Sequence, residues 1–215
     1  MKIQINPKTD ILGIIDYQND FIEEGGLAVL GGRALLSVIN ALTEKFTRTF
    51  ASQDWHPANH KSFASVNAMT PFSTIKFPYG LQTLWPDHCK QNTFGAEFVE
   101  GLNLSNCATI IRKGMNPSID SYSAFFENDK LTPTGLTGYL REIAVRRIFL
   151  VGLARYHCVA YTALDAIAQG FEVYIIEDAT AAIPDQFAGP DEQAATMTAR
   201  LRRAGVNIIQ SSDIE

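Results

Sequence analysis

The segment that decides the fold of this chain is Ile11-Leu12-Gly13-Ile14-Ile15-Asp16-Tyr17-Gln18-Asn19-Asp20. Its apolar half is typical of a short strand buried on both faces, and its polar half begins where that strand would end. Strands of this kind occur in parallel sheets, whose carboxyl ends deliver side chains to one crevice. We therefore expect Asp16 to lie at a functional site.

Further strands and helices are expected to alternate along the rest of the chain. The sequence pattern predicts six strands, at 11–17, 48–53, 108–113, 147–152, 172–176 and 206–209. Apolar residues at helical spacing predict four helices, at 33–46, 134–144, 159–169 and 191–204. This alternation indicates a parallel sheet with helices on both faces. The expected fold is α/β, a single-domain three-layer α/β/α sandwich with a central, mostly parallel six-stranded sheet. No repeat or linker divides the chain, so we expect one domain over residues 1–215.

One stretch lacks this regular pattern. Residues 55–101 read as irregular and contain four of the nine prolines and three of the four histidines. A long irregular stretch within a compact domain is more often functional than idle. We expect a metal-site loop region at about 54–101.

Composition and charge exclude several classes of protein. The net charge is −5 without a long basic run, which argues against a nucleic-acid surface. No apolar run is long enough to span a membrane, and the first ten residues lack the apolar core of a signal peptide. Cys89, Cys107 and Cys158 are irregularly spaced and do not form a disulfide framework, so we expect a cytoplasmic protein.

Three residues at or beyond strand ends form a candidate catalytic set. Asp16, Lys113 and Cys158 follow different predicted strands and should converge on one crevice. The carboxylate would take the thiol proton, and the ammonium group would stabilise the thiolate. Taken singly, each residue also fits an ordinary role, as a turn cap, a surface lysine and a buried apolar thiol.

A candidate metal site lies in the irregular stretch. Asp54 and His56 are two residues apart and would point the same way on an extended segment, and His88 supplies a second imidazole. One carboxylate and two imidazoles suit zinc, iron or manganese, and His60 is a further ligand or a support for one. The alternative is a group of surface histidines in a loop. Gly31-Gly32 lies outside any phosphate-binding pattern, so no nucleotide cofactor is expected.

These residues lie within motifs that resemble one family closely and nearly end to end. The chain is similar to nicotinamidases (pyrazinamidases) of the isochorismatase-like hydrolases. The motifs that carry the resemblance are Asp16-Tyr17-Gln18-Asn19-Asp20-Phe21, residues 52–60, Trp85-Pro86-Asp87-His88-Cys89, Lys113-Gly114, residues 120–126, residues 151–154 and Cys158-Val159.

The resemblance implies a complete reaction. The enzyme would hydrolyse nicotinamide to nicotinate and ammonia in salvage of NAD, and pyrazinamide is a further candidate substrate. Cys158 would attack the amide carbon to form a thioester, Asp16 would carry the thiol proton to ammonia, and Lys113 would stabilise the charged pair. The residues implied as metal ligands are Asp54, His56 and His88, with zinc expected and iron or manganese as alternatives.

The resemblance also implies the surroundings of the substrate. Phe21 and Trp85 would form aromatic walls around its ring, and Tyr122 would line the same pocket. A cis peptide bond is expected between Leu153 and Ala154, with the backbone N–H groups of Ala154 and Cys158 forming an oxyanion hole. Independently of the resemblance, His157 is ambiguous because it is next to Cys158 in the sequence, and its side chain is expected to point away from the site.

One turn departs from the family pattern. Where the family usually carries a threonine and an aspartate, this chain has Arg155 and Tyr156. Arg155 would either occlude the pocket or add charge that favours the thiolate. Two alternatives stay open, namely a related amidase or ureide hydrolase of the same superfamily and a non-catalytic protein that binds a metal and a pyridine.

The expected partner is a small molecule, with no nucleic acid or membrane, and a homo-oligomer is left open.

Overall fold

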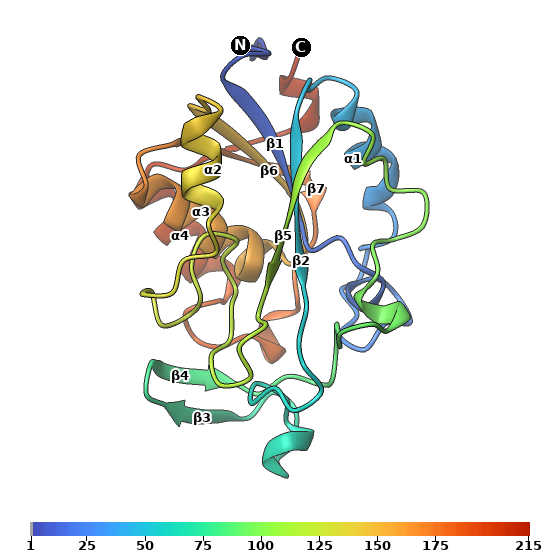
Figure 1. The fold of residues 1–215 in the computed structure, drawn as a ribbon, viewed down its shortest axis with the longest axis vertical. Coiled ribbons are helices and arrows are strands. Elements are labelled where there is room, and N and C mark those ends of the chain that lie inside the picture. The colour runs from blue at the N-terminus through green and yellow to red at the C-terminus, as the bar shows by residue number, and fades with distance from the viewer. Residues whose placement is uncertain (1) are drawn as a thin grey trace.

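The structure is a computed structural model that describes residues 2–215, and a six-stranded sheet lies at its centre (Figure 1). Neighbouring strands pair in parallel, in the order β5-β2-β1-β6-β7-β8. The strands are β1 (Asp10–Ile15), β2 (Thr49–Asp54), β5 (Cys107–Lys113), β6 (Arg147–Gly152), β7 (Glu172–Thr180) and β8 (Asn207–Ile209). The predicted α/β class and parallel six-stranded sheet are confirmed.

Helices cover both faces of this sheet and complete the predicted three layers (Figure 1). The helices are α1 (Leu35–Thr43), α2 (Leu136–Glu142), α3 (Ala160–Ala168) and α4 (Ala194–Ala204). Alternate side chains of β1 enter different hydrophobic clusters, because successive residues of a strand point to opposite faces. Leu12 and Ile14 pack in the cluster that contains α1, and Ile11 and Ile15 pack in the one that contains the other three helices.

Gly13 allows the neighbouring strands to pack tightly around the middle of β1. A Cβ at this position would lie 2.5 Å from Cζ of Phe50 on β2 and 2.9 Å from Cδ2 of Leu150 on β6. Such distances are shorter than van der Waals contact, so a larger residue would displace core side chains on both sides. The close packing of β2 and β6 against β1 thus requires a glycine at position 13.

The irregular stretch differs from its prediction. It contains an antiparallel hairpin of β3 (Thr74–Phe77) and β4 (Gly80–Thr83), which lies beyond one end of the main sheet (Figure 1). Pro78 and Tyr79 form the two-residue connection. Each strand has only four residues and one includes a glycine, so its alternation is too short to stand out among the prolines.

Two element boundaries near the site also differ from the prediction. β7 continues beyond residue 176 to Thr180, and its pairing with β6 is interrupted by a register shift after Leu150. A π-helical turn, Arg155–Val159, precedes α3. Across residues 2–215, no helix combines the length and apolar character needed to cross a membrane.

Candidate active site

The carboxyl ends of four neighbouring strands bring the predicted catalytic residues together. Asp16 follows β1, Asp54 is the last residue of β2, and Lys113 is the last residue of β5. Asp54 and Lys113 are direct partners in the register of β2 and β5. Cys158 lies in the π-helical turn that follows β6. Parallel strands thus gather residues that are far apart in sequence at one edge of the sheet.

Lys113 is the centre of this cluster and is fully buried. Its Nζ lies 2.8 Å from Oδ2 of Asp16 and 2.7 Å from Oδ1 of Asp54, and donates to the backbone oxygen of Ser121 at 2.8 Å. The Sγ of Cys158 lies 3.5 Å away. Burial opposes a charged lysine, but the two carboxylates outweigh burial and raise the pKa of Lys113 well above its usual range. The lysine is therefore a fixed positive charge beside the thiol.

Burial and the charge of Lys113 act in opposite directions on the pKa values of Asp16 and Cys158. Burial raises the pKa of Cys158 well above its ordinary value, although Lys113 opposes this, so the thiol carries its proton. Burial also raises the pKa of Asp16, and Lys113 again acts in the opposite direction. A hydroxyl hydrogen bond of 2.7 Å from Ser52 holds Oδ1 of Asp16, while Oδ2 faces Nζ of Lys113 at 2.8 Å. A carboxylate oxygen of Asp16 also lies within 4.8 Å of Sγ of Cys158, which places Asp16 near the thiol proton.

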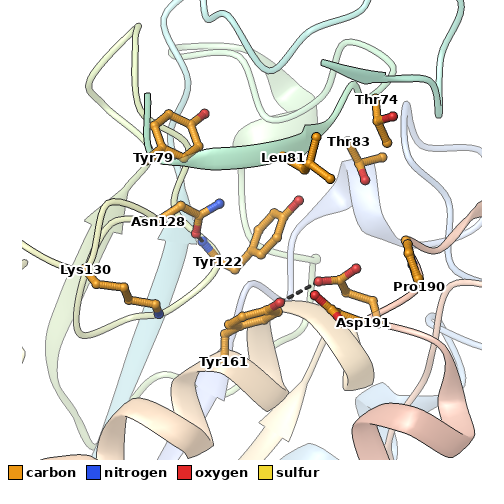
Figure 2. A pocket seen from close by; sticks show the side chains of 12 residues that line it. Thr74, Tyr79, Leu81, Thr83, Tyr122, Asn128, Lys130, Tyr161, Pro190 and Asp191 are labelled. Carbon is orange, nitrogen blue, oxygen red and sulfur yellow. Dashed lines mark hydrogen bonds between the residues drawn. The ribbon is translucent and has the colours of Figure 1, made fainter. Parts of the chain in front are cut away.

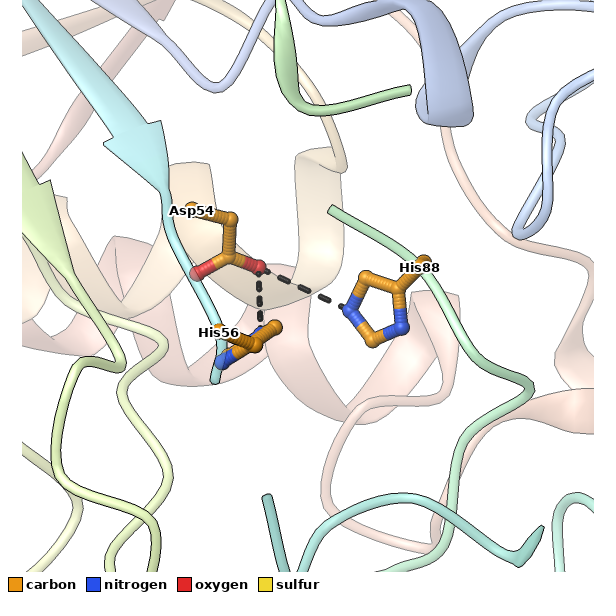
Figure 3. A group of neighbouring side chains, drawn as sticks. All are labelled: Asp54, His56 and His88. Carbon is orange, nitrogen blue, oxygen red and sulfur yellow. Dashed lines mark ion pairs between the residues drawn. The ribbon is translucent and has the colours of Figure 1, made fainter. Parts of the chain in front are cut away.

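Three further side chains form a group that fits a divalent metal ion (Figure 3). The Nε2 atoms of His56 and His88 face Oδ2 of Asp54 at 3.2 and 3.6 Å. Although burial opposes it, Lys113 and His56 hold the pKa of Asp54 well below its usual range, so its carboxylate is ionised. Asp54 therefore contacts Lys113 through one oxygen and faces both imidazoles through the other.

The tautomers of the two histidines support the metal interpretation. Nδ1 of His56 contacts the backbone oxygen of Gly114 at 2.9 Å, and Nδ1 of His88 contacts that of Pro86 at 2.7 Å. A carbonyl oxygen only accepts hydrogen bonds, so each Nδ1 carries a hydrogen, and in the neutral imidazole Nε2 is the nitrogen that offers a lone pair to a metal. Metal-binding histidines are held by bonds of this kind. Nε2 of His56 is buried without a hydrogen-bond partner, as expected of an atom that serves a ligand.

His60 lies beside this group without joining it. Its ring centre is 4.3 Å from that of His56, and its two nitrogens contact Oγ of Ser62 at 2.7 Å and the backbone oxygen of Ile119 at 3.3 Å. Burial lowers its pKa to about 4, so the imidazole is neutral. His60 packs against the ring of His56, and its predicted supporting role stays a prediction.

A cavity of about 20 Å³ adjoins the thiol and the metal group, and it is lined by Phe21, Leu27, Asp54, Trp85, His88, Asp120, Tyr122, Ala154, His157, Cys158 and Ile183. The three predicted wall residues are among them. This volume holds about one water molecule, so a ring-sized ligand enters only when wall side chains move apart. The peptide bond from Leu153 to Ala154 is cis, as the resemblance implied.

His157 was wrongly expected to point away from the site. It lines the cavity, is 97% buried, and neither ring nitrogen has a hydrogen-bond partner. Its ring lies 5.3 Å from that of Trp85 and 5.9 Å from that of Tyr122, with the planes nearly perpendicular. Burial lowers its pKa to about 4, so His157 offers one neutral donor and one acceptor to the cavity.

The sequence also failed to indicate several other lining residues. Leu27, Asp120 and Ile183 come from segments outside the main sheet and helices. Asp120 is the first residue of one quoted motif, and this was the only signal that marked it. Its carboxylate accepts hydrogen bonds from Gln82 at 2.7 Å and from the backbone of Ser121 at 2.8 Å.

A second hollow of about 180 Å³ shares Tyr122 with the cavity (Figure 2). The β3–β4 hairpin, the loop around Asn128 and Tyr161 of α3 surround it. Figure 2 shows Tyr122 between Tyr161 and the hairpin. Tyr122 thus lines both the cavity beside the thiol and this larger hollow.

Comparisons with known proteins agree with this geometry. The family model of the isochorismatase domain matches residues 10–213. The nicotinamidase of Acinetobacter baylyi is 48% identical over 171 residues, which cover 79% of this chain and 80% of that protein. A solved nicotinamidase–pyrazinamidase of Acinetobacter baumanii is 43% identical, with a TM-score of 0.92 over 97% of this chain and 99% of its own.

Two further solved structures contain small ligands. The PnC1 protein of L. infantum in complex with nicotinate is 39% identical, with a TM-score of 0.87 over 100% of this chain and 99% of its own. A pyrazinamidase of Pyrococcus horikoshii in complex with zinc is 33% identical, with a TM-score of 0.74 over 94% of this chain and 98% of its own.

Proposed function

This chain belongs to the isochorismatase domain family and is an enzyme that hydrolyses nicotinamide to nicotinate, and we propose that Cys158, Asp16 and Lys113 carry out this reaction. The observation that supports these roles is the position of Lys113. It contacts Asp16 and Asp54 and lies 3.5 Å from the thiol, so one buried cluster joins the nucleophile to the metal group.

In the proposed reaction the thiol proton moves before or during attack. Asp16 accepts the proton of Cys158, and the sulfur attacks the amide carbon of nicotinamide. The C–N bond then breaks, Asp16 gives the proton to the leaving nitrogen, and ammonia departs from a thioester on Cys158. Water, deprotonated by Asp16, attacks the thioester, which releases nicotinate and restores the thiol.

The charge of Lys113 supports each of these steps. When Asp16 takes the proton, a carboxylate is neutralised and a thiolate appears beside the ammonium group. The cluster of Asp16, Lys113 and Cys158 therefore keeps the same net charge throughout the transfer. This matters because an uncompensated charge in a buried site costs several kcal/mol.

The substrate is proposed to lie between the thiol and the metal group. Phe21, Trp85 and Tyr122 would contact its ring, and the backbone N–H groups of Ala154 and Cys158 would stabilise the oxyanion. Asp54, His56 and His88 would hold one divalent metal ion, and zinc fits this donor set, as iron and manganese also do. When bound, the ion supplies a Lewis acid that orients the substrate or water.

A comparison of substrates tests this proposal. Purified protein should release ammonia from nicotinamide and from pyrazinamide, and should not act on an N-carbamoyl amino acid. Turnover of the N-carbamoyl compound alone would assign the chain to another activity of the family. Binding of nicotinamide by calorimetry without ammonia release would identify a protein that binds the substrate without acting on it.

A further inference from the structure

We propose that Arg155 is a positioning residue that fixes the turn carrying Cys158 by tying it to the end of β7, an inference that rests on the proposed function. Arg155 is the first residue of the π-helical turn and does not line the cavity. Its side chain is directed toward β7 instead. It therefore neither occludes the pocket nor lies beside the thiol.

The end of β7 leaves the regular pairing with β6, and the hydroxyl of Thr180 already donates to the backbone oxygen of Glu177 there. The pairing of β6 with β7 is regular as far as Leu150 with Ile175, and it resumes only at Gly152 with Thr180. Two residues of β6 thus span five residues of β7, so β7 bulges between these points. A bulge leaves backbone groups without partners in the sheet, and buried backbone groups must find partners elsewhere.

The guanidinium group of Arg155 supplies these partners. Its Nη2 donates to the backbone oxygens of Glu177 at 2.6 Å and Thr180 at 2.8 Å, and its Nε donates to Oγ1 of Thr180 at 2.7 Å. Its Nη1 lies 3.2 Å from Oε1 of Glu177. Only a planar fork of donors can reach these acceptors together, so neither lysine nor a neutral residue replaces it.

The bonds connect the bulge directly to the nucleophile and to the cavity wall. The backbone N–H of Arg155 donates to the oxygen of Ala181 at 2.7 Å, and Cys158 follows three residues later within the same turn. Ile183, two residues after Ala181, lines the cavity. One side chain and its own N–H therefore hold the turn against the segment that leads into the opposite wall.

The expected consequence of removing this clamp is a loss of rate. Displacement of a reacting atom by about 1 Å can cost a factor of about 10² in rate. We expect Arg155→Met to lower kcat for nicotinamide by about 10- to 100-fold, with KM changed by less than about threefold. Arg155→Lys should recover only part of the loss, because it retains a charged donor group but not the planar fork. Thr180→Val removes the hydroxyl that accepts from Nε of Arg155 and donates to the backbone oxygen of Glu177, and it leaves the other bonds of Arg155 in place, so it should cost less than Arg155→Met.

The experiment measures ammonia release by the metal-loaded protein at several nicotinamide concentrations, with Arg203→Met as the control. Arg203 is an exposed arginine of α4, so its variant should retain wild-type kcat. A second measurement, the rate at which iodoacetamide alkylates Cys158 by peptide mass spectrometry, does not require turnover. It should change at least about threefold in Arg155→Met and stay unchanged in Arg203→Met.

The outcomes separate this inference from the proposed function. If the wild type releases no ammonia, the proposed function fails, and the alkylation rates still decide the role of Arg155. If Arg155→Met has the wild-type kcat and alkylation rate, the inference about Arg155 is wrong. It is also wrong if the variant changes KM and leaves kcat unchanged. If circular dichroism shows that Arg155→Met does not fold, Arg155→Lys and Thr180→Val decide in its place. Wild-type kcat and alkylation rates in both would overturn the inference.

Discussion

Replacing Lys113 by methionine tests the electrostatic account of the site. The change removes the only cation between two buried carboxylates at 2.7 and 2.8 Å, and it keeps the length of the side chain. Breaking a buried ion pair on one side costs about 3–5 kcal/mol, because it leaves a charge without a partner. For a domain of this size, each kcal/mol lowers Tm by about 2–4 °C, so Tm should fall by roughly 6–20 °C.

The loss of stability in Lys113→Met should also depend on pH, in a direction that can be measured. Without Lys113, the pKa of Asp16 should rise further, since burial already raises it and the ammonium group opposes this. A carboxyl group whose folded pKa lies above its unfolded value favours folding at low pH, and this contribution is lost as pH rises through the folded pKa. The deficit of Lys113→Met should therefore be smaller at pH 5 than at pH 8.

Differential scanning calorimetry of the metal-loaded protein measures both effects, and Lys90→Met is the matched control. Lys90 contacts Asp87 at 3.3 Å, but both side chains are more than one-third exposed. Exposed pairs contribute about 0–1 kcal/mol, so this variant should lose little. Equal Tm losses in the two variants, or normal ammonia release by Lys113→Met, would refute the reasoning.

Three further predictions concern the thiol, the metal and the buried imidazole. Cys158→Ala should abolish ammonia release and leave metal content unchanged by atomic emission; loss of the metal would show that the thiol is a ligand. A strong chelator should remove activity, and added zinc, iron or manganese should restore it, whereas an unchanged rate would exclude the metal from the reaction. Burial lowers the pKa of His157 to about 4, below its unfolded value near 6.5, so the unfolded chain binds the proton first as pH falls. His157 should therefore cost roughly 3 kcal/mol of stability as pH falls from 6.5 to 4, and calorimetry should show a smaller loss over this interval in His157→Gln than in the wild type.

Parallel-sheet geometry explains why the catalytic candidates could be found from sequence. Asp16, Asp54 and Lys113 each end or directly follow a strand that the sequence predicted, and such ends meet at one edge. Cys158 follows a strand too, although a turn intervenes. The sequence pattern thus specified the fold class and the place of these residues, and the structure shows the contacts among them.

Other features depend on geometry that sequence patterns do not encode. His157 lies in the π-helical turn and lines the cavity, whereas its place next to Cys158 in the sequence suggested that it would point away. The side chain of Arg155 is directed toward the bulge of β7. The sequence Glu177-Asp178-Ala179 within that bulge resembles a loop more than a strand. The lining by Leu27 and Ile183 depends on the paths of irregular segments, which follow no period.

The central claim is that Cys158 is the nucleophile within a buried cluster beside a metal group. Acid quenching of the metal-loaded protein during turnover of nicotinamide, followed by peptide mass spectrometry, tests this claim most directly. A nicotinoyl group on the peptide that contains Cys158 is the predicted result. The same group on Cys89, on Cys107 or on any residue other than Cys158 would contradict the account.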